Sequence, residues 1–132
     1  WTQADFTGRR ILLVEDNELN REIAETILTE SGFAVETAPD GTDAVNMVRQ
    51  AEEYYYDAVL MDVQMPVMDG YEATRTIRAL PRKDVKGLPI IAMTANAMEE
   101  DKETALKSGM NAHLAKPLNI DLFLKTLGKY LN

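Results

Sequence analysis

The sequence predicts an α/β domain in which a five-stranded parallel sheet is covered by helices on both of its faces. Short apolar runs alternate with amphipathic segments five times along the chain, as expected for repeated strand–helix units. The chain has 132 residues, of which 45% are hydrophobic, so its length and composition suit a single domain. Residues 1–8 are polar and turn-prone and are expected to be the tail or remnant of a linker, with residues 9–132 forming the domain.

The first two units each begin with a short run of strand length. Residues 11–14 are continuously apolar and form the first predicted strand. The helical segment after them ends at a glycine, and its apolar face consists of Leu19, Ile23, Ile27 and Leu28. Residues 33–37 form the second predicted strand. Asp40-Gly41 then opens a helix whose inward residues are Ala44, Val45, Val48 and Ala51.

The third unit begins with a strand at residues 57–61, which runs directly into Asp62. Its helix begins near Gly70 and ends before Pro81, because proline cannot continue a helix. Three tyrosines precede this strand at residues 54–56, and we expect them to pack in the loop and against a helix end.

The last two units follow a charged segment, residues 81–87, that is predicted to be a solvated loop. The fourth strand is predicted at residues 88–93, and a charged helix follows from about residue 98 to residue 108. The fifth strand is short, residues 112–115, and the chain closes with a helix. The apolar residues of this last helix, at helical spacing, are Ile120, Phe123, Leu124, Leu127 and Leu131.

The alternation of units also restricts how the strands are ordered. Crossovers between parallel strands are right-handed, which leaves few topologies for five strands. The flavodoxin-like order 2-1-3-4-5 is the one we predict, and it places the first and third strands side by side at the switch point. Ligands of such sheets bind beyond the carboxyl ends of the strands, so the residues that follow the strands are the candidate site.

Acidic side chains gather at that edge of the predicted sheet. Glu15 and Asp16 follow the first strand and Asp62 ends the third, and neighbouring strands lie only ~4.8 Å apart. Two carboxylates about 4 Å apart repel by about 1 kcal/mol in water and ~4 kcal/mol at an effective dielectric of 20. A divalent cation would relieve this repulsion, and oxygen ligands with open positions suit Mg²⁺.

Two further residues extend the site. Thr94 follows the fourth strand and Lys116 follows the fifth, which adds a hydroxyl and an ammonium group beside the metal ligands. Metal, ammonium and hydroxyl together form a cradle for a phosphoryl group. The acceptor must be a nucleophile that needs no base, because the chain has a single histidine, and a carboxylate meets that condition. Asp62 is therefore the candidate phosphoacceptor.

Each of these residues also has a simpler interpretation. Glu15 and Asp16 could cap the first helix, where acidic residues are favoured. Asp62 could form a turn, Thr94 could be an ordinary β-branched strand residue, and Lys116 a solvated loop lysine. The combination at one edge of the sheet is what favours the phosphoryl-binding interpretation.

Composition excludes several other functions. Lys and Arg total 14 against 22 Asp and Glu, giving a net charge of −8, which disfavours direct contact with nucleic acid. The absence of cysteine excludes disulfides, cysteine-ligated zinc and thiol catalysis. No apolar stretch approaches the ~20 residues of a membrane span, so we expect no membrane contact by this domain. Because the chain begins with Trp rather than Met, we expect a module of a longer protein or a processed product.

Four segments carry a resemblance to a known family. They are residues 13–17 (LVEDN), 61–70 (MDVQMPVMDG), 93–97 (MTANA) and 113–117 (HLAKP). In this order, each at the end of a predicted strand, they resemble the receiver domain of two-component response regulators. The amino-acid sequences of these segments are most similar to those of receivers attached to hybrid histidine kinases.

The resemblance implies a role for each residue of the site. It makes Asp62 the aspartate that takes a phosphoryl group from a phosphohistidine. It makes Glu15 and Asp16 the acidic pair that organises Mg²⁺, with Mn²⁺ as an alternative ion, and the backbone carbonyl of Gln64 a further ligand. Thr94 and Lys116 then hold the phosphoryl oxygens.

The resemblance also implies a switch and a slow return reaction. His113 stands where the family carries a switching aromatic side chain, and it would move with Thr94 to reshape the face formed by residues 98–108, 112–115 and 120–131. Gln64 and Asn96 would orient water for slow self-dephosphorylation. The implied partner is a histidine kinase or a histidine phosphotransfer domain, with a homodimer on phosphorylation as a further expectation. The implied location is the cytoplasm, on a parent chain that could be membrane-anchored.

Three rival functions stay open at this level. A Mg²⁺-dependent aspartyl-phosphate phosphohydrolase would need a general acid two residues after Asp62, where this chain has Gln64. A flavin or nucleotide module would need a glycine-rich phosphate loop, which the sequence lacks. A pseudo-receiver that only binds partners would not need the full set of Glu15, Asp16, Asp62, Thr94 and Lys116.

Overall fold

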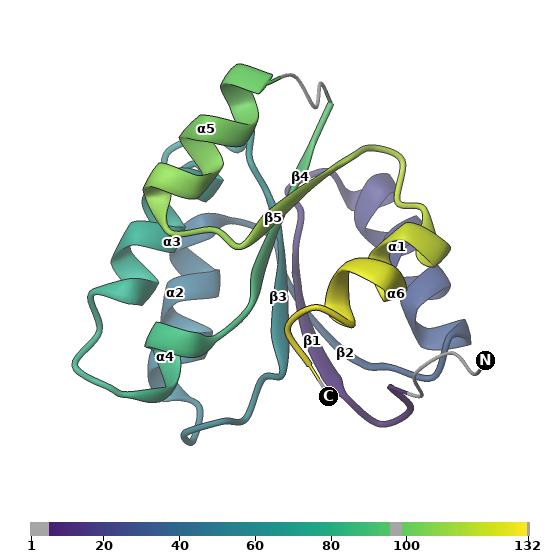
Figure 1. The fold of residues 1–132 in the computed structure, drawn as a ribbon, viewed down its shortest axis with the longest axis horizontal. Coiled ribbons are helices and arrows are strands. Elements are labelled where there is room, and N and C mark those ends of the chain that lie inside the picture. Colours follow the sequence, from purple (N-terminus) through teal and green to yellow (C-terminus); the bar gives the residue numbers. More distant parts are fainter. Residues whose placement is uncertain (1–5, 96–98, 132) are drawn as a thin grey trace.

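The chain forms one parallel sheet between two layers of helices (Figure 1). The computed structural model describes residues 6–95 and 99–131. The sheet order is β2-β1-β3-β4-β5 with all pairs parallel, which confirms the predicted topology. The strands are β1 (Arg10–Val14), β2 (Ala34–Ala38), β3 (Ala58–Asp62), β4 (Ile90–Thr94) and β5 (Ala112–Ala115).

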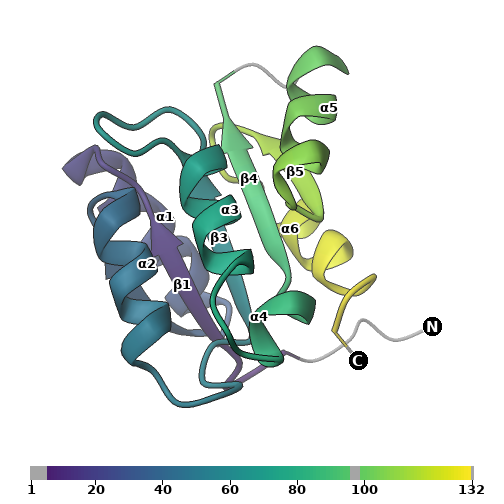
Figure 2. The same ribbon diagram turned by 90° about the vertical axis from the view of Figure 1, so that its left-hand side faces the viewer.

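Helices cover both faces of the sheet, as predicted. They are α1 (Glu18–Glu30), α2 (Gly41–Gln50), α3 (Gly70–Arg78), α4 (Asp84–Gly87), α5 (Glu99–Ser108) and α6 (Ile120–Leu127). The helices α1 and α6 lie on one face, whereas α2, α3, α4 and α5 lie on the other (Figures 1 and 2). Both ends of the described chain lie near the amino ends of the strands (Figure 1).

Short polar side chains begin four of the helices. Asn17, Asp40, Asp69 and Asn119 each accept a hydrogen bond from the backbone N–H three residues later. Such capping satisfies an N–H group that the helix itself cannot pair, and it typically stabilises a helix by about 1 kcal/mol. Two of these caps, Asn17 and Asp69, lie in the loops that follow β1 and β3, so they also shape the edge of the sheet where the site is predicted.

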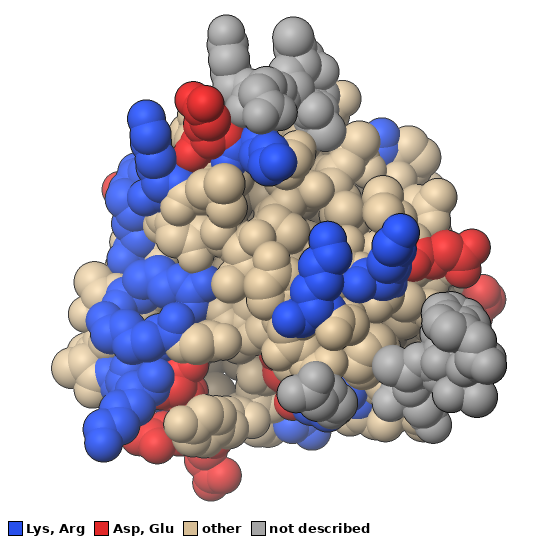
Figure 3. Space-filling view, in the orientation of Figure 1, with Lys and Arg blue, Asp and Glu red and all other residues tan. Residues whose placement is uncertain are grey.

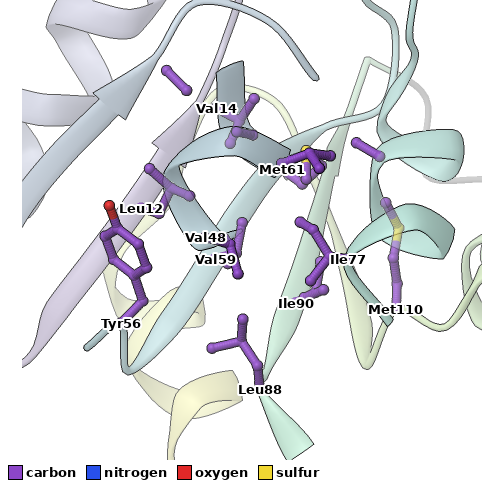
Figure 4. Close-up of a cluster of buried hydrophobic side chains, with 14 of the residues drawn as sticks. Leu12, Val14, Val48, Tyr56, Val59, Met61, Ile77, Leu88, Ile90 and Met110 are labelled. Atoms are coloured by element: carbon purple, nitrogen blue, oxygen red, sulfur yellow. The ribbon is translucent and has the colours of Figure 1, made fainter. Parts of the chain in front are cut away.

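Each face of the sheet has its own apolar core. On the α2–α5 face, Leu12, Val59 and Ile90 from three strands pack with Val48 and Ile77 from the helices (Figure 4). On the other face the strand residues pack against Leu28 of α1 and Phe123 and Leu127 of α6. Since β1, β3 and β4 are buried on both faces, their continuous apolar runs are explained.

The predicted inward face of α1 is wrong for two residues. Leu19 and Ile23 are 64% and 49% exposed, and the buried residues of this helix are Ala24 and Leu28. The face of the helix that packs against the sheet is the one that contains Ala24 and Leu28, which lie one turn apart. Ile23 instead lines an open pocket beside the carboxyl ends of the strands, and none of the described elements covers this apolar side chain.

The segment 81–87 is more ordered than the solvated loop that was predicted. It contains the short helix α4, and Val85 is fully buried in the core. The Arg82 side chain forms an ion pair with Asp84 at 2.8 Å and donates hydrogen bonds to the carbonyls of Val48 and Ala51 at the end of α2. These contacts hold the segment against α2, which the charged sequence pattern does not reveal.

The three tyrosines before β3 have different environments. Tyr56 is buried, and its hydroxyl donates a 2.8 Å hydrogen bond to Glu36 of β2. Tyr55 also donates to Glu36, and the Arg10 guanidinium lies 3.9 Å from the centre of its ring. Tyr54 is 72% exposed with a positive φ. The predicted packing therefore holds for Tyr55 and Tyr56 but not for Tyr54.

Candidate functional site

The loops at the carboxyl edge of the sheet bring together the residues that the sequence predicted. Glu15 directly follows β1, Asp62 ends β3 and Thr94 ends β4, and the side chains of all three are buried. Lys116 directly follows β5 and is partly exposed. Its backbone N–H donates a 2.8 Å hydrogen bond to the Thr94 carbonyl, which ties the last loop to β4. The peptide bond that follows Lys116 is cis.

Lys116 lies between two buried carboxylates. Its Nζ is 3.0 Å from Glu15 Oε2 and 3.0 Å from Asp62 Oδ1. The side chains of these acids are only 1% and 2% exposed, so the pairs lie largely out of water. One ammonium therefore faces two carboxylates, and the buried site has an excess of negative charge.

This arrangement shifts the pKa values of the site. Burial raises the pKa of Asp62 to about 7, because the contact with Lys116 opposes the effect of burial only in part and the neighbouring Glu15 adds to it. Burial by itself lowers the pKa of Lys116, but its hydrogen bonds with Asp62 and Glu15 outweigh burial and raise this pKa overall. Such shifts, produced by burial and by specific partners, are common at functional sites.

The acidic cluster has the chemistry of a site for a hard divalent cation. Carboxylate oxygens of Glu15, Asp16 and Asp62 lie within 4.8 Å of one another, and Asp16 is exposed while the other two are buried. Asp62 Oδ2 is buried and accepts no hydrogen bond from any residue that the structure describes. A buried carboxylate oxygen without a partner is costly, and a cation would remove that cost. The donor set fits Mg²⁺.

The loop after β3 contacts Asp62 through its backbone. The Gln64 N–H lies 3.2 Å from Asp62 Oδ1 and donates to it, whereas the Gln64 side chain is exposed. A Cβ at Gly70 would lie 2.3 Å from the Asp62 carbonyl oxygen, so only glycine fits where α3 begins. Val67 has a φ of +69° and is 99% exposed, which places an apolar side chain in solvent beside the site.

The other predicted residues lie in different surroundings. His113 is half-buried on β5 and lines a groove between α5 and α6. Asn96 lies outside the described residues. Arg21 was not anticipated: its guanidinium donates a 2.9 Å hydrogen bond to the Glu15 carbonyl and fixes the loop after β1. The sequence gives no signal for this contact, because Arg21 binds a backbone carbonyl and not an acidic side chain of the loop.

The described residues form no helix that is long and apolar enough to cross a membrane.

Comparison with known proteins agrees with this geometry. The family model for the response regulator receiver domain matches residues 11–128. The sensor histidine kinase RcsC of Escherichia coli is 42% identical over 127 residues, covering 96% of this chain and 13% of that protein. Hybrid signal transduction histidine kinase I of Dictyostelium discoideum is 38% identical over 121 residues, covering 90% of this chain and 7% of its own length. The chain thus spans a small part of these relatives.

Solved structures extend the comparison. The receiver domain of the sensor histidine kinase PA1611 from Pseudomonas aeruginosa, with magnesium coordinated in its active-site cleft, is 43% identical with a TM-score of 0.82, covering 94% of this chain and 98% of that one. The receiver domain of Ssk1 from Saccharomyces cerevisiae was crystallised with the histidine phosphotransfer protein Ypd1. It is 29% identical with a TM-score of 0.80, covering 95% of this chain and 90% of that one. Fold, site geometry and family match together show that this chain belongs to the response regulator receiver domains of two-component phosphorelays.

Proposed function

We propose that Asp62 accepts a phosphoryl group from a phosphohistidine on a partner protein, in a reaction that depends on Mg²⁺. The observation that carries this proposal is the Lys116 ammonium 3.0 Å from both Asp62 and Glu15, in a buried site with an excess of carboxylates. An incoming phosphoryl group adds negative charge, so a site for it needs both this ammonium and a divalent cation.

Phosphoryl transfer to Asp62 requires mainly that the reacting groups are positioned and that their charge is stabilised. A carboxylate oxygen of Asp62 attacks phosphorus as the P–N bond to the histidine breaks, and the imidazole leaves with the electron pair of that bond. The nucleophile must be ionised, and Lys116 favours the ionised form of Asp62. Lys116 then pairs with a phosphoryl oxygen of the aspartyl phosphate, and the buried Thr94 hydroxyl is close at the end of the next strand.

Glu15, Asp16 and Asp62, whose carboxylate oxygens lie within 4.8 Å of one another, would hold the metal ion. In this proposal the backbone carbonyl of Gln64 would be a further ligand. Bound Mg²⁺ supplies positive charge that stabilises the transferring phosphoryl group. In this proposal Thr94 and His113 then link the phosphoryl group to the face formed by α5, β5 and α6. Gln64 and Asn96 influence how fast water removes the phosphoryl group.

The side of the molecule that meets the phosphate donor is formed by α1 and the loop after β5. Leu19 and Ile23 are exposed there, and Ile23 lines a pocket of about 330 Å³ whose other walls include Met93, Pro117 and Leu118. This pocket also touches Glu15 and Lys116, so a partner seated in it reaches the site. A histidine phosphotransfer domain is the partner we propose, which agrees with the complex of the Ssk1 receiver domain.

We infer that the domain accepts a phosphoryl group without rapid turnover of phosphate esters. A phosphohydrolase with an aspartyl-phosphate intermediate needs a proton donor for its leaving group. The residue two positions after Asp62 is Gln64, whose amide N–H groups are too weakly acidic to protonate a leaving group and whose side chain is exposed. Incubation with a panel of small phosphate esters should therefore release no more than one equivalent of alcohol for each protein molecule at first, and any further release should be only as slow as hydrolysis of the aspartyl phosphate.

Intact-mass analysis tests the central proposal. After incubation with Mg²⁺ and a small-molecule phosphodonor, the protein should gain the mass of one phosphoryl group. Asp62→Asn removes the nucleophile with little change of shape and should gain nothing, and chelation of Mg²⁺ should have the same effect on the unaltered protein. A phosphorylated Asp62→Asn variant would overturn the assignment of the acceptor.

A further inference from the structure

The basic side chain of Arg21 contacts the loop that carries two of the proposed metal ligands. Arg21 is half-buried near the start of α1, and its guanidinium donates a 2.9 Å hydrogen bond to the backbone carbonyl of Glu15. That carbonyl belongs to the peptide unit that joins Glu15 to Asp16, and the carboxylates of both residues belong to the acidic cluster. Arg21 is therefore bound to the backbone of the proposed magnesium site.

Positive side chains are rare in this part of the chain. Residues 1–69 contain 15 Asp and Glu against 4 Lys and Arg, and Figure 3 shows Lys and Arg side chains gathered along the side formed by α3, α4 and α5 instead. Helical spacing places Glu18 and Glu25 one turn from Arg21, where ion pairs within a helix commonly form. Among the described residues Arg21 forms an ion pair with neither of them, and its guanidinium reaches the loop after β1.

Three hydrogen bonds hold the loop after β1 around Glu15. The Glu15 N–H donates to the carbonyl of Ala38 at the end of β2 at 3.1 Å, and the Asn17 N–H donates to Glu15 Oε1 at 3.2 Å. The bond from Arg21 holds the carbonyl on the other side of the Glu15 Cα. Because the Asp16 side chain is exposed, the orientation of this peptide unit, rather than packing, determines where the Asp16 carboxylate lies.

Arg21 has two opposing effects on a cation at this site. Its positive charge repels the cation and by itself lowers the affinity about two- to fivefold at low salt. The fixed peptide unit raises the affinity, because less of the loop has to be ordered on binding. Mg²⁺ requires near-ideal octahedral geometry at about 2.0–2.1 Å, whereas Ca²⁺ accepts about 6–8 oxygens in flexible geometry at about 2.3–2.6 Å. A fixed loop therefore favours Mg²⁺ over Ca²⁺, whereas a charge acts on both ions alike.

We propose that Arg21 is a positioning residue that raises the magnesium affinity of the site and its selectivity for magnesium over calcium. By holding the peptide unit between Glu15 and Asp16, it fixes the Asp16 carboxylate relative to Asp62 in an arrangement that suits the smaller ion. A guanidinium offers no lone pair to a metal, so Arg21 acts through the loop and not as a ligand. This inference rests on the magnesium site proposed above.

Metal titrations of the unphosphorylated protein test the proposal. Isotope-labelled protein is titrated with Mg²⁺ and, separately, with Ca²⁺, and the amide chemical shifts of residues 15–17 and 62–64 report binding at the site. Arg21→Met keeps a long side chain but removes the donors and the charge. Its Mg²⁺ affinity should fall at least about fivefold, at low salt and also at about 0.3 M salt, while its Ca²⁺ affinity should fall about twofold or less.

Two further variants are matched controls. Arg21→Lys keeps the charge and an N–H donor without the planar fork, and it should recover part of the Mg²⁺ affinity. Arg49→Met removes the same charge from an exposed position in the last turn of α2, and it should leave the ratio of the two affinities unchanged. Circular dichroism checks that each variant is folded. If Arg21→Met does not fold, Arg21→Gln, which is also neutral, takes its place with the same expected result.

The direction of the change separates positioning from charge. A rise in the Mg²⁺ affinity of Arg21→Met that disappears at high salt would show that the guanidinium acts only as a charge, and it would overturn the proposal. Equal losses for Mg²⁺ and Ca²⁺ would also overturn it, because they would indicate general damage to the site. Unchanged Mg²⁺ binding by Arg21→Met would contradict only the role of Arg21, whereas a failure of the unaltered protein to bind Mg²⁺ would contradict the magnesium site itself.

Discussion

The carboxyl group of Asp62 links the stability of the protein to pH. Its pKa is raised from 3.8 to about 7, chiefly by burial, so between these values the folded protein binds a proton that the unfolded chain has released. In metal-free solution the contribution of Asp62 to the free energy of unfolding therefore decreases as pH rises from about 4 to about 7. Above that range the folded state carries an unfavourable buried charge.

Urea unfolding at several pH values measures this effect. The unaltered protein should lose stability between pH 5 and pH 8 relative to Asp62→Asn, with a difference on the order of 1–3 kcal/mol. Added Mg²⁺ should restore stability at pH 8 in the unaltered protein, because it neutralises the ionised cluster. Parallel curves for the two proteins would show that Asp62 is not the group that titrates.

At the level of secondary-structure elements, one arginine joins α3 to three neighbouring segments. The Arg78 guanidinium has five N–H donors, and it reaches the carbonyls of Val85, Leu88 and Gly109 and the Asn111 side-chain oxygen at 2.7–3.0 Å. These acceptors lie at α4, before β4 and between α5 and β5. Burial lowers the pKa of Arg78, and the acceptors that the structure describes around it are carbonyl and amide oxygens rather than carboxylates.

Removing this guanidinium should destabilise the protein strongly. Arg78→Met leaves buried carbonyl groups without a donor, and we expect a loss of about 2–4 kcal/mol in urea unfolding. Arg78→Lys keeps the charge but offers fewer donors without the planar fork, so it should recover only part of the loss. Arg75→Met is the matched control, because Arg75 is exposed on the same helix, and it should change stability by less than about 0.5 kcal/mol. Equal effects at both positions would contradict the role given to Arg78.

Helix α1 also carries a prediction, because two of its apolar residues face solvent. Ile23→Glu should slow phosphoryl transfer from a histidine phosphotransfer domain by about tenfold or more, since it places a charge in the proposed interface. Phosphorylation by a small-molecule donor should be unchanged, because Ile23 is neither the acceptor nor one of the proposed metal-binding or phosphoryl-binding residues. Leu106→Glu, at a similar exposure on α5, should leave both rates unaltered. Slowing of the small-molecule reaction by Ile23→Glu would place this residue in the chemistry instead.

Across the whole molecule, charge is distributed unevenly. Residues 1–69 contain 15 Asp and Glu against 4 Lys and Arg, whereas residues 70–132 contain 7 against 10. The acidic part includes α1, α2 and the proposed metal ligands, and the basic part includes α3 and the segment around α4. The negative potential of the first part attracts cations toward the site, and it acts over about a Debye length.

Magnesium affinity should therefore respond to charges that do not touch the metal. Glu18→Gln with Glu22→Gln neutralises two exposed acids of α1, and we expect Mg²⁺ affinity to fall about two- to fivefold at low salt. The difference should shrink as ionic strength rises to about 0.3 M, since salt screens exposed charges. Calorimetric titration measures both, with Lys83→Gln as a control that should change little. A loss that persists at high salt would indicate a change of structure rather than of potential.

Most of the fold could be predicted because the pattern of apolar residues is local. Parallel strands that are buried on both faces need continuous apolar runs, and residues 11–14 and 58–61 show such runs. The inward face of α1 could not be predicted in the same way. Whether Leu19 and Ile23 are covered depends on which elements reach that side of the helix, and no helix or strand that the structure describes covers them.

The candidate site also has a part that the sequence predicts and a part that depends on tertiary packing. The proximity of Glu15, Asp62 and Lys116 could be predicted from the sequence, because the ends of parallel strands meet at one edge of a sheet. The contribution of Arg21 to the loop after β1, and of Arg78 to the segment around α4, depends on long side chains that reach carbonyl groups of other turns. Such contacts have no spacing rule in the sequence.

The sequence by itself determined the order of the strands and the set of residues at the carboxyl edge, because strand burial and right-handed crossovers leave few alternatives. Only the tertiary structure decided which charges share a buried space and which apolar residues stay exposed. The distance of 3.0 Å from Lys116 to two carboxylates, and the exposure of Leu19 and Ile23 on α1, arise from packing between segments far apart in the chain. Electrostatic interactions depend on such distances and on burial, and neither quantity is contained in a local pattern.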